Sequence, residues 1–208
     1  MKKLLVVLGL LVLVPGLALA QGAPPPTGGG SATYYVDYYA NNWGPEATYD
    51  QIIRIVNVGS LGTPLTSPVG DICANIYVFD PDQELIACCA ERLTPNELDS
   101  AFVGKDLTFN TLTTYIPPTG VVKIALTPPP TGGCDPTAPL TAADATLGAV
   151  WGTHLNTTGG YTFLTETGKG HQTLGAGEAA FLPQACSFAL YLGSGRGTCR
   201  SYVSTGQH

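Results

Sequence analysis

The chain has 208 residues with a formal net charge of −6, and only 12% of its residues are charged. Its 26 glycines and 17 prolines favour short strands joined by turns over long charged helices. The acidic balance and the lack of a basic cluster exclude nucleic acid and anionic membrane surfaces as expected partners.

The first twenty residues have the three parts of a secretory signal peptide. Lys2 and Lys3 supply a positive start, residues 4–13 are almost wholly apolar, and Ala18-Leu19-Ala20 is a small-x-small cleavage site. Cleavage after Ala20 removes two of the nine basic residues and leaves a mature net charge of −8. No later apolar run is long enough for a membrane span, so we expect a secreted, extracytoplasmic protein.

Residues 21–32 contain a proline run and a glycine run but no large apolar side chain, which predicts a flexible tether. We expect residues 33–203 to form a single β-rich domain and residues 204–208 a disordered tail. Directly after the tether, residues 33–39 are rich in tyrosine and predict a strand. Its side chains alternate between two faces, with Tyr34, Val36 and Tyr38 on one face and Tyr35, Asp37 and Tyr39 on the other.

Further strands follow from runs of β-branched and aromatic residues between turn residues. Residues 72–90 predict a β-hairpin, because two apolar runs flank Asp80-Pro81-Asp82-Gln83, a sequence typical of a tight turn. The other expected strands are 51–58, 107–115, 120–127, 147–155 and 161–165.

Two helices are expected. Thr94-Pro95-Asn96-Glu97 has the residues of a capping box, with threonine as N-cap and glutamate three positions later, and predicts a short helix near 95–101. Apolar residues at a spacing of three to four predict a second helix near 178–191. The whole pattern favours an Ig-like antiparallel β-sandwich with one C-terminal helix.

From Ile72 onward the chain contains ICANIYVFDPDQELIACCA, LTPN, NTLT, WGTHL and GSGRGTCRS. These segments resemble a family of secreted bacterial proteins of unassigned function. The resemblance covers residues 72–201 and implies export and a shared fold, but it transfers no catalytic residue. Members of that family commonly have cysteines where this chain has Glu91 and Tyr202. If those two pair in relatives, the end of the hairpin lies close to the C-terminal segment.

All six cysteines follow the cleavage site, in the compartment where disulfides form and persist. Six cysteines allow fifteen pairings, and adjacent Cys88 and Cys89 point to opposite faces of a strand. Our working assignment is Cys73–Cys89, Cys88–Cys134 and Cys186–Cys199. Zinc binding is the alternative, but the chain has no CxxC motif, and adjacent cysteines do not supply the geometry of a zinc site. We expect no metal and no cofactor.

Candidate catalytic residues are few. His154, His171 and His208 are the only histidines, and we interpret His154 as a structural residue on a strand and His171 as a loop residue. The segment 193–197 (GSGRG) does not fit the GxSxG nucleophile motif. Asp80, Asp82 and Glu84 alternate as calcium ligands could, but a solvated hairpin turn accounts for them. The separation of Glu166 and Glu178 cannot be judged from sequence.

Three classes of function follow from these observations. The first is a non-catalytic structural or surface-assembly protein that associates with copies of itself or other extracellular proteins through strand 33–39, whose side chains include Tyr34, Tyr35, Val36, Tyr38 and Tyr39. The same strand could instead complete its own sheet. The second is a glycan- or ligand-binding module that uses Tyr35, Tyr39, Trp43 and Tyr161 for stacking. The third is a hydrolase, which requires His154 or His171 beside a carboxylate.

Overall fold

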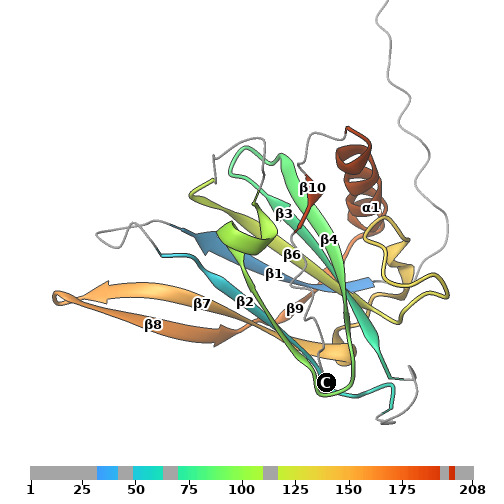
Figure 1. Cartoon of the computed structure of the whole chain (residues 1–208), viewed down its shortest axis with the longest axis horizontal. Coiled ribbons are helices and arrows are strands. Elements are labelled where there is room, and N and C mark those ends of the chain that lie inside the picture. The colour runs from blue at the N-terminus through green and yellow to red at the C-terminus, as the bar shows by residue number, and fades with distance from the viewer. Residues whose placement is uncertain (1–31, 42–48, 63–69, 110–116, 193–196, 200–208) are drawn as a thin grey trace, which may run out of the picture.

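The computed structural model describes residues 32–41, 49–62, 70–109, 117–192 and 197–199. The predicted signal peptide, most of the tether, Trp43, Tyr202 and His208 lie outside these residues. The described strands form two sheets (Figure 1). In order, the larger contains β10 (Gly197–Thr198), β4 (Leu85–Leu93), β3 (Ile72–Phe79), β6 (Thr119–Thr127), β1 (Ala32–Ala40) and β9 (His171–Leu174). The smaller contains β5 (Leu98–Phe102), β2 (Ile52–Asn57), β7 (Gly148–Thr158) and β8 (Tyr161–Gly168).

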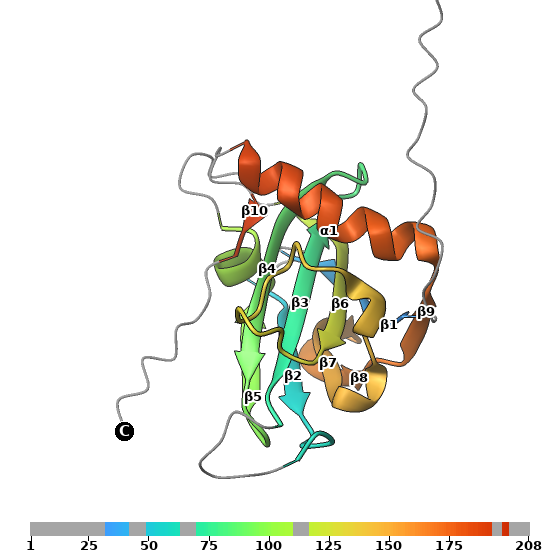
Figure 2. The ribbon, with the colours of Figure 1, turned by 90° about the vertical axis from the view of Figure 1, so that its right-hand side faces the viewer.

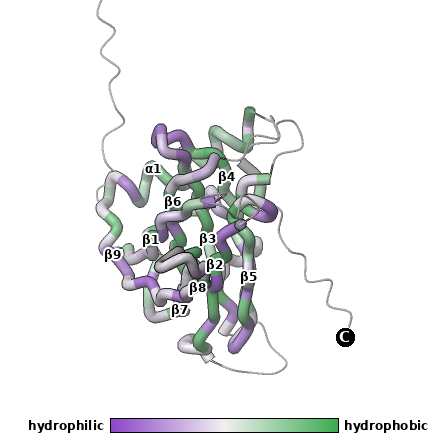
Figure 3. The backbone as a smooth tube through the Cα atoms, turned by 90° about the vertical axis from the view of Figure 1, so that its left-hand side faces the viewer, coloured by the Kyte–Doolittle hydropathy of each residue, from purple (hydrophilic) through white to green (hydrophobic). Residues whose placement is uncertain are grey.

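The larger sheet is covered on both faces. Every residue of β3 is buried, because its alternate side chains enter two different cores. Ile76 and its neighbours on one face pack against the smaller sheet, while Tyr77 and Phe79 pack beneath the helix α1 (Ala176–Tyr191). Figure 2 shows α1 lying across the larger sheet, and Figure 3 shows hydrophobic residues along much of β3. The molecule is therefore a β-sandwich with a C-terminal helix, as the sequence predicts.

Most of the predicted strands are present. The hairpin of β3 and β4 is confirmed, and the Asp80 side chain closes its turn by accepting hydrogen bonds from the backbone N–H groups of Asp82 and Glu84 at 3.0 and 2.9 Å. Strands expected at 33–39, 51–58, 120–127, 147–155 and 161–165 correspond to β1, β2, β6, β7 and β8.

The short helix predicted near 95–101 is wrong. Glu97 does accept hydrogen bonds from the backbone N–H and the hydroxyl of Thr94, at 2.7 and 2.9 Å. This contact closes a tight turn, in which Asn96 has a φ of +68°, and the chain then enters strand β5. Pairing with β2 provides the backbone partners that a helix would otherwise supply, so tertiary structure overrides the local capping pattern.

The strand predicted at 107–115 is also wrong where the structure describes it. Val103–Leu107 forms one π-helical turn, and the Asp106 carboxylate accepts a hydrogen bond from the backbone N–H of Phe102 at 2.9 Å. Residues 110–115 lie outside the described residues.

All three disulfides of the working assignment are wrong in their pairing. The structure joins Cys73 to Cys134, Cys88 to Cys186 and Cys89 to Cys199. The hairpin register explains the error, because Cys73 lies opposite Arg92 and is three positions away from Cys89 along the ladder.

Cys88 and Cys89 point to opposite faces of β4, as adjacent residues of a strand do. Cys88 faces α1 and tethers that helix to β4, whereas Cys89 faces the core between the sheets and binds Cys199, which follows β10. Strand β10 pairs in parallel with β4. The described C-terminal residues thus lie beside the second strand of the hairpin.

Candidate functional site

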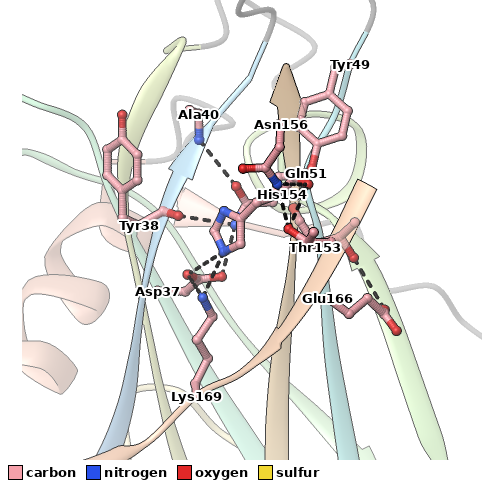
Figure 4. A network of polar contacts seen from close by, with 11 residues as sticks. Asp37, Tyr38, Ala40, Tyr49, Gln51, Thr153, His154, Asn156, Glu166 and Lys169 are labelled. Atoms are coloured by element: carbon pink, nitrogen blue, oxygen red, sulfur yellow. Dashed lines mark hydrogen bonds and ion pairs between the residues drawn. The ribbon is translucent and has the colours of Figure 1, made fainter. Parts of the chain in front are cut away.

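A polar cluster between the two sheets brings together Asp37 of β1, His154 of β7 and Lys169, which lies between β8 and β9 (Figure 4). Asp37 faces inward because β1 alternates and Tyr35 and Tyr39 occupy the same face. The Nζ atom of Lys169 lies 2.6 Å from Oδ1 of Asp37 and 2.8 Å from Nε2 of His154. The Nε2 atom of His154 lies 3.6 Å from the same Asp37 oxygen. One carboxylate, one ammonium and one imidazole therefore meet at a single site, in which Asp37 is buried and His154 is partly exposed.

The buried Asp37 carboxylate also accepts a hydrogen bond from Gln51. Its side chain is only 2% exposed, and Gln51 donates from Nε2 to its second oxygen at 2.9 Å. Gln51 is itself held by β1, because it donates to the Tyr38 carbonyl and accepts from the backbone N–H of Ala40. A buried charge requires such partners, since burial without them costs several kcal/mol.

Gly152 of β7 makes room for this cluster. A Cβ atom at that position would lie 1.9 Å from Oδ2 of Asp37 and 2.8 Å from Cε of Lys169. Real Cβ atoms do not approach so closely, so the ion pair depends on a residue without a side chain at this point of the strand.

Burial lowers the pKa of His154, and the neighbouring Lys169 ammonium lowers it further, while Asp37 opposes both effects. The imidazole is therefore neutral at neutral pH, and its Nε2 accepts a hydrogen bond from Lys169. Because that nitrogen faces a cation and a carboxylate, it is not directed at a hydroxyl or thiol that it could activate. The cluster holds β1 of one sheet against β7 of the other.

The structure places the remaining candidate groups apart from this cluster. Glu166 forms an ion pair with Arg54, which also donates to the Thr153 hydroxyl at 2.8 Å. Glu178 of α1 forms an ion pair with Lys123 of β6. His171 lies in β9 with an exposed side chain. Each of the two glutamates thus has its own cationic partner. The sequence did not identify the Asp37 cluster because Asp37 is more than a hundred residues from both His154 and Lys169.

The tyrosine-rich strand is not an open edge. β1 lies between β6, which pairs with residues 35–40, and β9, which pairs with residues 32–35, so the strand completes its own sheet. The Gln51 side chain bonds to the backbone of Tyr38 and Ala40. Tyr35 and Tyr39 are buried, which rules out the stacking surface expected for them, and Trp43 lies outside the described residues. Tyr161 is 78% exposed, as that expectation requires.

Among the described residues, the longest strand at the edge of a sheet is instead β8. Among the described strands at sheet edges, β10, β9 and β5 have two, four and five residues, whereas β8 has eight. Its side chains are exposed on both faces, including Tyr161 and Leu164, the latter at 59%. Figure 1 shows the β7–β8 hairpin projecting from the body of the molecule.

Comparison of the chain with family models, curated proteins and solved structures finds no match. Within the described part of the chain, no helix is both long and apolar enough to cross a membrane. The same residues contain no group of three histidine, cysteine or acidic side chains that could hold a metal ion.

Proposed function

We propose that this protein is an exported, non-catalytic assembly protein, and that two copies associate by pairing their β8 strands. The observation that carries this proposal is the length and exposure of β8 at the edge of the smaller sheet. An unpaired edge presents a row of backbone N–H and C=O groups that another strand can complete.

The edge of β8 lacks the features with which proteins prevent such pairing. It contains no proline and no lysine, which are the residues that most often block an edge. Its one charged residue, Glu166, is paired with Arg54 in the same molecule, so its charge does not repel an approaching strand. Tyr161, Phe163 and Leu164 are exposed and would lose water on contact.

A second copy is the partner that this surface fits. Two antiparallel β8 strands related by a two-fold axis satisfy each other's backbone groups with the same residues on both sides. The predicted signal peptide and the three disulfides support the extracytoplasmic part of the proposal, because disulfides persist in oxidising compartments.

The test is the mass in solution of the mature chain, purified with its disulfides intact. Sedimentation velocity over a wide concentration range should show a monomer–dimer equilibrium. The variant Leu164→Lys should remain monomeric, because it places a charge on the edge strand. Phe188→Lys is the matched control, since Phe188 is an exposed apolar residue on α1, and it should still dimerise. A wild-type chain that stays monomeric throughout, or a Leu164→Lys variant that dimerises normally, would refute the proposal.

A further inference from the structure

A cavity of about 510 Å³ lies on the larger sheet, where β1, β3 and β6 meet the first turns of α1. This volume falls within the range of small-molecule sites. The cavity is distant in topology from β8, because every strand that lines it belongs to the other sheet. Dimer formation through β8 therefore does not account for it.

Aromatic rings form much of this cavity. Phe79 of β3 and Phe181 of α1 stack with their centroids 6.5 Å apart and their planes 25° from parallel. Tyr38 of β1 also lines the cavity, and it is 57% exposed. Phe181 is 46% exposed, so both outer rings offer surface to a ligand. Exposed aromatic side chains of this size are costly in water and are typical of binding surfaces.

Polar groups surround these rings. Lys123 and Glu178 form an ion pair at one side, and Asp80 and Gln83 of the β3–β4 turn lie at another. Donors and acceptors of both kinds therefore border an apolar surface. A wholly apolar ligand, such as a lipid chain, would cover these groups without pairing them, which is unfavourable.

The charges also exclude ionic ligands. Glu178 is neutralised by its ion pair with Lys123, and Asp80 and the negative net charge of the whole chain repel an anion. The Nζ atom of Lys123 already lies 4.9 Å from the centre of the Phe79 ring and occupies the position that a ligand cation would take. The ligand that fits is neutral, has an apolar face and carries several hydroxyl groups.

We propose that this cavity binds a neutral saccharide. The C–H face of a sugar ring would lie on Phe181 and Tyr38, and its hydroxyl groups would bond to the Lys123–Glu178 pair and to Gln83. This site does not depend on the pairing of β8, so a monomeric variant should bind sugar as well as the wild-type chain does.

The test uses the mature chain with intact disulfides and a panel of neutral oligomers of glucose, mannose, galactose and N-acetylglucosamine. Saturation-transfer NMR identifies which oligomers bind, and titration calorimetry gives their affinities. We expect at least one member of the panel to bind. Tyr38→Ala and Phe181→Ala should each weaken that binding about tenfold or more, as expected for loss of a stacked ring.

Two controls separate binding in the cavity from binding elsewhere on the protein and from loss of folding. Tyr191→Ala removes another exposed ring of the same helix, outside the cavity, and should leave the affinity unchanged. Because Tyr38 and Phe181 are partly exposed, both variants should still unfold cooperatively well above the assay temperature, with Phe181→Ala somewhat less stable because it loses its stack on Phe79. Lost binding is then not lost folding. The proposal is overturned if no saccharide of the panel binds, if the two cavity variants bind normally, or if choline chloride or sodium sulfate binds in place of sugar.

Discussion

The substitution Gly152→Ala tests the Asp37 cluster most directly. The added Cβ atom would lie 1.9 Å from Oδ2 of Asp37, so the carboxylate has to turn away from Lys169. Breaking a buried ion pair costs about 3–5 kcal/mol, and replacing a strand glycine returns about 0.5–1 kcal/mol of backbone entropy. We therefore expect the free energy of unfolding to fall by about 2–4 kcal/mol. This is a large fraction of a typical domain stability of about 5–15 kcal/mol.

The assay is urea denaturation under non-reducing conditions, with two comparisons. Gly170→Ala lies next to Lys169, and a Cβ atom there has nothing within 4 Å, so its stability should match the wild type. In an Asp37→Ala background the clash with the carboxylate is absent, and the remaining 2.8 Å contact is with Cε of the flexible Lys169 side chain, so Gly152→Ala should cost less than about 1 kcal/mol. The reasoning fails if Gly152→Ala costs less than about 0.5 kcal/mol in the wild-type chain, or costs equally in both backgrounds.

Two further substitutions test other parts of the fold. Burial, together with the charges of Asp99 and Glu97, raises the pKa of Glu91 to about 7 from its ordinary 4.5. Between pH 4.5 and about 7 the folded state thus binds more protons than the unfolded state, so the free energy of unfolding should fall as the pH rises through this range. In urea denaturation, Glu91→Gln should make the free energy of unfolding depend less steeply on pH there. Tyr35→Phe removes a hydroxyl that lies 2.8 Å from the carbonyl oxygens of Ala145 and Gly148, and should cost about 1–2 kcal/mol in the same assay. Equal stability of Tyr35→Phe and wild type would contradict this assignment.

Local patterns in the sequence predicted the features that depend on neighbouring residues. Alternation in 33–39 correctly placed Asp37 with Tyr35 and Tyr39 on one face, because successive side chains of any strand point in opposite directions. The same rule separated Cys88 from Cys89. The hairpin followed from a turn sequence whose Asp80 side chain bonds to the backbone two and four residues later.

Features that depend on pairing between distant segments could not be predicted in this way. Thr94 and Glu97 form the contact expected of a capping box, but residues 98–102 form strand β5 because they pair with β2. The disulfides depended on a register that set Cys73 opposite Arg92. Tyr35 and Tyr39, expected at the surface, are buried, because their face of β1 packs in the core between the two sheets.

The sequence by itself determined which residues share a strand face, where the hairpin turns and where the C-terminal helix lies, since these follow from backbone geometry over a few residues. Tertiary structure alone decided that Asp37, His154 and Lys169 meet, and that the longest described strand at a sheet edge is β8. The physical reason is that sheet order and register are set by the burial of whole strands, whose contacts join segments far apart in the chain.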